Sequence, residues 1–255
     1  MSFVHTHSSS RFDRALPVLL DAVRKFVADC DLLTLTEVSS EAREKVLRVV
    51  AQEENWAVLT GDLSSRDDCA IMYDKDIWKA RYVETREVTN KSFIIFGHTS
   101  KPVAAISAIL EHLDTGKLVL VSVCHLPSSV EGKKGLTGKV SRVHAWRDAH
   151  RGWRRRWNQL AKRYKVDGVL VCGDWNINIK RKVFQVLLKG LQPAMRPTLD
   201  YKRLPVRGTH GNRLIDFTFI RGDLRVTFRP IVAPQGPSSD HKPYQEGLGL
   251  TPTRR

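Results

Sequence analysis

The chain has 255 residues, 42% of them hydrophobic, which is enough to bury a sizeable core in one large or two small domains. No run approaches the roughly 18 apolar residues of a membrane span, the N-terminus lacks the layout of a secretion signal, and the four cysteines form no C-x-x-C pair, so we expect a cytoplasmic protein with free thiols. The charge is strongly positive, since 42 Lys and Arg against 27 Asp and Glu give +15, and this favours nucleic acid as a partner over a merely soluble basic surface or an anionic membrane.

The first sixty residues predict two successive strand and helix units. A short strand near Phe3–Ser8 precedes an amphipathic helix that reaches Val27. A second strand, Leu32–Thr36, precedes a helix that Ser39 or Ser40 can cap. Alternation of this kind indicates a layered α/β protein.

From residue 56 onward, short β-rich runs dominate, with few helical signals among the first six of them, which predicts hairpins and antiparallel pairing. The runs are Trp56–Leu59, Cys69–Tyr73, Arg81–Val88, Phe93–Phe96, Val103–Ile109, Lys117–Cys124, Val169–Cys172, Asp216–Ile220, Leu224–Ile231 and Gln245–Leu250. A long helix over 141–165 and a short one near Arg181–Leu188 interrupt them. The pattern predicts a single α/β domain over residues 1–255, with two facing sheets, helices outside and a short flexible tail at 251–255.

The helix over 141–165 has one aromatic face and an otherwise basic circumference. Its apolar positions, which include Trp146, Trp153 and Trp157, recur three and four residues apart and predict packing on a sheet. Asp148 is its only acid, whereas a helix solubilised by ion pairs would mix both signs. We therefore predict contact with nucleic-acid phosphates, assisted by a basic loop before the helix, over the alternative of an ordinary solvated face. The predicted contacts are Lys133, Lys134, Lys139, Arg147, Arg151, Arg154 and Arg155.

Acidic, amide and histidine side chains stand at the ends of several strand-like runs, where a rigid sheet can aim them at a substrate. They are Glu37, His125, Asp174, Asn176, Asp216 and the Ser239-Asp240-His241 segment of a Gly/Pro/Ser-rich loop. Each residue alone has an ordinary alternative as a turn-forming or solvated strand-end residue. Their number and order along one chain favour a common site.

Between residues 30 and 245 the chain resembles the endonuclease/exonuclease/phosphatase (DNase I-like) superfamily, which includes exonuclease III and the abasic-site endonucleases. The pieces that carry the resemblance are Leu35-Thr-Glu37, Val123-Cys-His-Leu126, Gly173-Asp-Trp-Asn176, Arg213-Leu-Ile-Asp216 and Ser239-Asp-His241. The first motif of the family, Thr-x-Asn, is missing, and the corresponding segment Phe3–Ser8 would put His7 where a metal-binding Asn is expected. The resemblance implies a four-layered α/β sandwich in which two mainly antiparallel β-sheets pack face to face with helices outside.

The resemblance also implies a divalent-metal-dependent nuclease that hydrolyses phosphodiester bonds in DNA, which we expect to act as a monomer. Glu37, Asp240 and His7 would hold Mg²⁺, or Mn²⁺ as the alternative. His241, oriented by Asp216, would be the general base or an electrostatic partner.

The three remaining residues, Asp174, Asn176 and His125, complete the expected catalytic set. Asp174 would orient or deprotonate the attacking water or help to protonate the leaving group, and Asn176 and His125 would contact the phosphate. Two alternatives remain open. One is a phosphomonoesterase of the same fold that acts on lipid head groups or small phosphates, and the other is a nucleic-acid-binding protein that has lost turnover.

Overall fold

A computed structural model describes most of the chain, and the statements below concern only the described residues. These are 2–7, 16–38, 40–61, 68–89, 93–95, 98–100, 102–128, 142–178, 195–197, 209–210, 213, 215–232 and 244–250. The predicted short helix at 181–188 and the predicted tail at 251–255 lie outside them. Within these ranges, no helix is long and apolar enough to cross a membrane.

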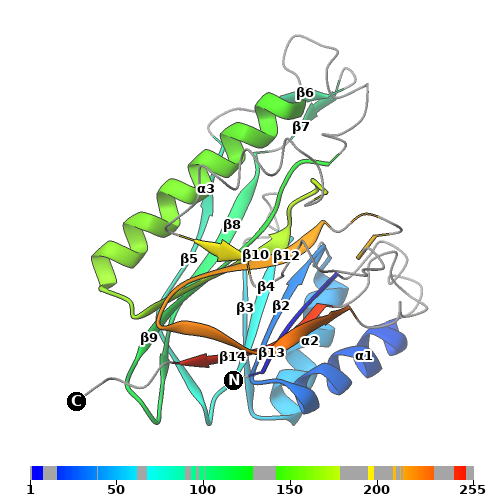
Figure 1. Ribbon diagram of the computed structural model, residues 1–255. Helices are drawn as coiled ribbons and strands as arrows, with labels where there is room; N and C mark the ends of the chain where they lie inside the picture. Colours follow the sequence, from blue (N-terminus) through cyan, green and yellow to red (C-terminus); the bar gives the residue numbers. More distant parts are fainter. Residues whose placement is uncertain are drawn as a thin grey trace.

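Two six-stranded sheets form the body of the protein (Figure 1). The first has the order β13-β14-β1-β2-β4-β3 and consists of β1 (Ser2–His7), β2 (Leu32–Thr36), β3 (Trp56–Thr60), β4 (Ala70–Asp74), β13 (Leu224–Val232) and β14 (Tyr244–Leu250). The second has the order β11-β12-β10-β9-β8-β5 and consists of β5 (Trp78–Glu87), β8 (Ala104–His112), β9 (Leu118–His125), β10 (Gly168–Asp174), β11 (Arg196–Pro197) and β12 (Asp216–Gly222). A separate hairpin pairs β6 (Phe93–Ile95) with β7 (His98–Ser100).

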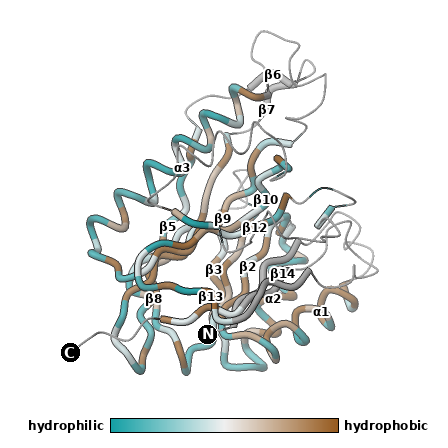
Figure 2. Tube along the Cα trace, in the orientation of Figure 1, coloured by the Kyte–Doolittle hydropathy of each residue, from teal (hydrophilic) through white to brown (hydrophobic). Residues whose placement is uncertain are grey.

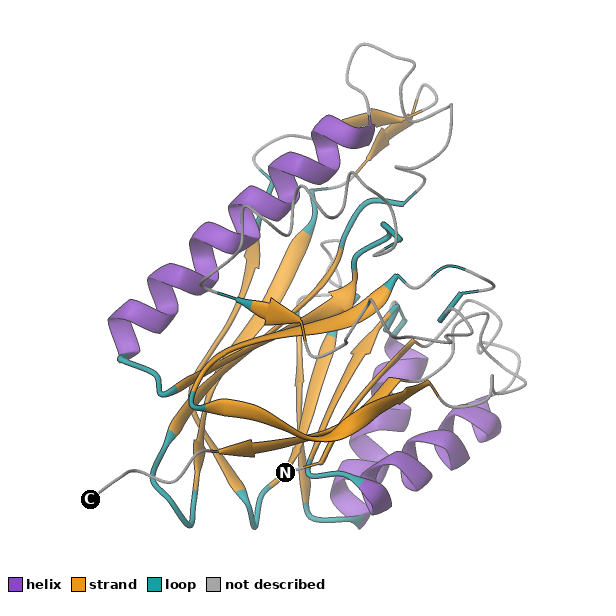
Figure 3. Cartoon of the chain, viewed as in Figure 1, coloured by secondary structure: helices purple, strands orange, loops and turns teal. Residues whose placement is uncertain are grey.

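The helices of the described residues lie on the outer faces of these sheets (Figure 3). The helices α1 (Leu16–Asp29) and α2 (Glu41–Glu53) accompany the first sheet, and α3 (Arg142–Tyr164) crosses the second. Ser40 caps α2 by accepting a hydrogen bond from the backbone N–H of Arg43, as one of the two serines was predicted to do. The arrangement confirms the predicted four-layered sandwich.

Each of the three spaces between the four layers holds an apolar core. Trp153 of α3 packs on the second sheet, and Val121 and Leu170 belong to the layer between the two sheets. Leu33 and Leu47 belong to the core beneath α1 and α2. The tryptophans of α3 are therefore core residues, as predicted, while the rest of that helix is mainly hydrophilic (Figure 2).

The topology of the two sheets decides where functional side chains can meet. Each sheet contains one parallel pair, β1 with β2 and β9 with β10, and its other pairs are antiparallel. The first pair is connected through α1 and the second through α3. Because the carboxyl ends of parallel strands lie at one edge of a sheet, residues that end β1, β2, β9 and β10 are brought to common edges.

Most predicted strands are present with small shifts at their ends, and the differences have local causes. β5 begins at Trp78 rather than Arg81 because a register shift between Ala80 and Tyr82 interrupts the apolar alternation there. The strands β7 and β11 were not predicted, since His98-Thr-Ser100 and Arg196-Pro197 carry no apolar pattern. All four cysteines are buried thiols.

Replacing Gly173 with Ala should destabilise the protein by about 3 kcal/mol or more. Gly173 has φ +151°, and an added Cβ would lie 2.0 Å from the carbonyl oxygen of Cys124. Gly116→Ala is the matched control, because Gly116 also has a positive φ, +68°, but its added Cβ meets nothing within 4 Å. Urea unfolding measures the free energy of unfolding of both variants. An equal decrease in the two variants would show that the close contact of Gly173 with β9 is unimportant.

Candidate active site

Three of the predicted residues meet at one end of the second sheet. His125 is the last residue of β9 and Asp174 the last of β10, and the parallel register pairs them directly. Asp216, the first residue of β12, pairs with Asp174 on the other side. Asp174 and Asp216 are both buried, with 2% and 0% of their surfaces exposed.

Glu37 approaches the same place from the first sheet. It directly follows β2, and His7 at the end of β1 pairs with Thr36. The two sheets touch near this end, where Thr34 Oγ1 of β2 lies 3.4 Å from Cys172 Sγ of β10. The topology therefore brings Glu37 and His7 to the same end of the sandwich as His125 and Asp174.

His125 is held between two carboxylates. Its Nδ1 lies 2.9 Å from Asp68 Oδ2, and its Nε2 lies 3.4 Å from Asp174 Oδ2. Asp68 was not among the predicted site residues. It precedes β4, which pairs with β2, and its backbone oxygen accepts a hydrogen bond from Val38 N at 2.7 Å, so it lies across from Glu37. The one sequence feature that could have identified Asp68 is its position as an acid just before the apolar run Cys69–Tyr73.

The surroundings of His125 favour its charged form. Burial by itself would lower the pKa of this histidine, but the charge and hydrogen bond of Asp68, and then the charges of Asp174 and Glu37, raise it to about 10. The side chain is only 21% exposed. Three carboxylates thus concentrate negative charge around one imidazolium at the end of the sandwich.

In EDTA, the free energy of unfolding should fall by about 2–4 kcal/mol between pH 7 and pH 10 as His125 titrates. The pKa of His125 is about 10 in the folded chain, against an ordinary value near 6.5 in the unfolded chain. The stabilisation is therefore complete below about pH 6.5 and is lost as the pH rises through 10. His125→Asn, which cannot titrate, should show a distinctly shallower fall in urea unfolding. If the free energy of unfolding falls equally with pH in the unaltered chain and in His125→Asn, the loss of stability does not come from His125.

The loop that carries Asp174 and Asn176 is fixed by its own polar groups. Asp174 Oδ1 accepts from Asn176 N at 2.7 Å, and Asn176 Nδ2 donates to the carbonyl of Leu126 at 2.8 Å. Between them, Trp175 N donates to Ile215 O at 2.9 Å, and the Trp175 ring is buried under α3, where Trp146 Nε1 donates to its carbonyl at 2.6 Å. One amide hydrogen of Asn176 is thus engaged, and the second can serve a ligand.

The conformation of Glu37 is also imposed by a neighbour. Glu37 has φ 62°, a left-handed backbone that few non-glycine residues adopt. Arg43 of α2, only 1% exposed, donates from Nη1 to the Glu37 carbonyl oxygen. Sequence reasoning missed Arg43, because an arginine in a mixed-charge helix resembles a solvated residue. It is a buried support for the Glu37 turn.

The donor chemistry of this end of the sandwich fits a hard divalent cation. Among the described residues, no three His, Cys, Asp or Glu side chains come together as a metal-binding group. Mg²⁺, however, keeps several waters and needs only one or two protein carboxylates together with substrate phosphate. Glu37 can supply one, and the concentration of carboxylates that raises the pKa of His125 would attract the ion.

The other predicted residues divide into two groups. Arg147, Arg151, Arg154 and Arg155 lie on α3, and all except the half-buried Arg154 are exposed. The remainder, Asp240, His241, Lys133, Lys134 and Lys139, lie outside the described residues, and for His7 only the strand position is described. Their predicted roles stay predictions.

A model of the family described as the endonuclease/exonuclease/phosphatase family matches residues 11–241. No curated protein sequence matches the chain at a significant level. Among solved structures, a Bacteroides thetaiotaomicron mannosyl-6-phosphatase is 14% identical with a TM-score of 0.73, and the match covers 98% of this chain and 100% of that one.

Two further solved structures have the same architecture. The human Nocturnin catalytic domain with bound sulfate is 13% identical with a TM-score of 0.73, over 98% of this chain and 94% of the other. The D. rerio TDP2 complex with a single-strand DNA product is 15% identical with a TM-score of 0.67, over 98% and 99%. At these identities the likeness shows the fold alone.

Proposed function

The chain belongs to the endonuclease/exonuclease/phosphatase family, whose members act on phosphodiester and phosphate esters, and we propose that it is a divalent-metal-dependent nuclease that hydrolyses phosphodiester bonds in DNA. The observation that carries the proposal is the position of His125 between Asp68 and Asp174, with Glu37 supplied from the facing sheet. A structural ion pair has no need of four ionisable groups drawn from both sheets.

Each described residue has a chemical task in this reaction. The Asp68 carboxylate fixes the orientation of the His125 ring and keeps it protonated, so that its N–H can donate to a phosphate oxygen and offset the charge that develops there. Asp174 orients the attacking water or accepts its proton, and the remaining amide hydrogen of Asn176 donates to phosphate. A bound cation would supply Lewis-acid stabilisation of phosphate charge, with Glu37, Asp240 and His7 as its proposed ligands. Asp216 would orient His241, as the family resemblance implies.

The charge of the chain favours nucleic acid over a small phosphate as the substrate. The net charge is +15, and the arginines of α3 form a basic surface on the second sheet. A basic surface that runs along a helix of 23 residues is longer than one sugar phosphate or inositol phosphate needs, and it suits an extended polyanion. The following experiment therefore distinguishes the nuclease from a phosphatase and from a nucleic-acid-binding protein without turnover.

Incubation of the purified protein with plasmid, labelled single- and double-stranded DNA, RNA and inositol phosphates, each in Mg²⁺, Mn²⁺ or EDTA, tests the proposal. We expect metal-dependent DNA cleavage that EDTA abolishes, with nicking or end-trimming giving the mode. Release of inorganic phosphate while DNA stays intact would replace the nuclease by a phosphatase. Salt-sensitive DNA binding without cleavage in any metal would indicate a binding protein.

A further inference from the structure

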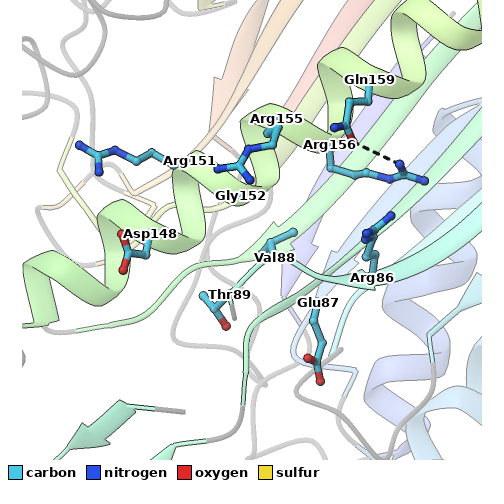
Figure 4. Close-up of a pocket in the computed structure, with 10 residues that line it drawn as sticks. All are labelled: Arg86, Glu87, Val88, Thr89, Asp148, Arg151, Gly152, Arg155, Arg156 and Gln159. Carbon is cyan, nitrogen blue, oxygen red and sulfur yellow. Dashed lines mark hydrogen bonds between the residues drawn. The ribbon is translucent and has the colours of Figure 1, made fainter. Parts of the chain in front are cut away.

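A cationic pocket of about 400 Å³ lies between α3 and the end of β5, and its lining contains none of the proposed catalytic residues (Figure 4). Its charged lining residues are Arg86, Arg151, Arg155, Arg156, Glu87 and Asp148. Four arginines thus face two carboxylates. In Figure 4 the Glu87 carboxylate points away from α3, so the helix side of the pocket is mainly guanidinium.

The base of this pocket is built from close backbone packing. A Cβ placed on Gly152 would lie 1.8 Å from the carbonyl oxygen of Val88, so α3 rests directly on the end of β5 at this point. Val88 N donates to Val103 O at 2.8 Å, and Val103 N donates to the buried Thr89 hydroxyl at 2.9 Å. These bonds tie the end of β5 to β8. The arginines therefore project from a fixed surface.

The positive charge of the pocket is only partly compensated by the protein. Arg156 pairs with Glu84, and although burial would raise the pKa of Glu84, the hydrogen bonds of Arg156 and Tyr82 and the charge of Arg86 lower it. The single carboxylate of Glu84 thus offsets the charge of both Arg156 and Arg86. Arg151 and Arg155 are exposed, and neither has an ion pair with any described residue.

The buried His150 lies beside these arginines on α3. Its ring is buried against Trp146 and Trp175. Burial first, and then the charges of Arg154 and Arg151, lower its pKa to about 4. The positive charges on this part of α3 therefore act on a buried side chain. An anion bound in the pocket would reduce the repulsion among these charges.

The pocket lies at the same end of the second sheet as the catalytic residues. Glu87 pairs with Ala104, and Ala105 pairs with Cys124, the residue before His125. Two strand spacings, about 10 Å, separate β5 from β9. That is the rise of about three nucleotides of a stacked strand. A strand with one phosphate at His125 can therefore place another near β5.

We propose that this pocket binds a backbone phosphate of the nucleic-acid strand that is cleaved at the active site, a few nucleotides from the scissile bond. The assignment rests on the proposed function and narrows it, because the substrate is then a polynucleotide strand and not a nucleotide or sugar phosphate. Arginine forks suit this task, since each can donate two parallel hydrogen bonds to one phosphate.

Fluorescence anisotropy with labelled oligothymidylates of 4, 8 and 12 nucleotides tests the assignment in the full chain carrying Asp174→Asn, which prevents cleavage. Arg151→Glu/Arg155→Glu is compared with Lys162→Glu/Arg163→Glu, which makes the same charge change at exposed positions at the far end of α3. We expect the pocket variant to weaken binding of the 12-mer about tenfold or more and to remove the gain in affinity with length. The control should change the 12-mer affinity less than threefold.

If the two double variants lose equal affinity for the 12-mer, the effect is one of net charge and the assignment is wrong. The assignment is also wrong if neither double variant loses affinity. Failure of the nuclease proposal looks different. In that case the chain with Asp174 intact would cleave none of the oligonucleotides in Mg²⁺ or Mn²⁺, while the anisotropy comparison would still report whether the pocket binds the strand. Circular dichroism of each variant verifies the fold.

Discussion

Asp174→Asn should lower kcat for DNA cleavage by about 10³-fold or more and leave the protein folded. The side chain is 2% exposed and ends β10, with Oδ2 3.4 Å from His125 Nε2. The amide is nearly isosteric, and its oxygen can still accept the hydrogen bond from Asn176 N. It cannot take a proton, however, and it removes one of the charges that keep His125 protonated.

Single-turnover cleavage of a labelled oligonucleotide in saturating Mg²⁺ measures this effect on the chemical step. Asp114→Asn is the matched control, because Asp114 lies exposed in the turn between β8 and β9 and the same exchange there should leave kcat within twofold. Urea unfolding separates lost chemistry from lost stability. Wild-type rates in a folded Asp174→Asn protein would exclude Asp174 from the reaction.

The fold was largely predictable because its signals are local. Strand runs and helical periodicity are read within windows of a few residues, and the two strand-helix-strand units follow from their order along the chain. The position of His125 and Asp174 at the ends of neighbouring strands follows from the same local pattern once β9 and β10 pair in parallel. Site residues at the ends of apolar runs could therefore be named from sequence.

Partners that arise only from strand pairing or helix packing could not be named. Asp68 reaches His125 because β4 returns antiparallel to β2, and in the sequence it is one acid of an Asp67-Asp68 pair that reads as a turn. Arg43 looks like a solvated helix residue, yet it is 1% exposed beneath Glu37. The pocket beside β5 likewise depends on the contact of Gly152 with Val88, which no periodicity encodes.

Glu37→Gln should abolish the response to divalent metal and lower DNA cleavage by about 10³-fold. The turn that presents Glu37 is held at its backbone, where Arg43 donates to the carbonyl oxygen, so the substitution leaves the support of the turn intact. What changes is the charge of the side chain. A neutral amide is a weaker ligand than a carboxylate for Mg²⁺ or Mn²⁺.

A readout independent of activity is the rise in Tm when Mg²⁺ or Mn²⁺ is titrated into metal-free protein, because an ion that binds only the folded chain stabilises it. We expect this rise for the unaltered chain and for Glu41→Gln, a matched exchange at an exposed position in the first turn of α2. Glu37→Gln should show little or none. If Tm rises as much in Glu37→Gln as in the unaltered chain, the cation is held by other ligands. If Tm rises in this way but DNA cleavage is lost, Glu37 orients the substrate and does not bind the cation. The two measurements together therefore separate metal binding from catalysis at a single carboxylate.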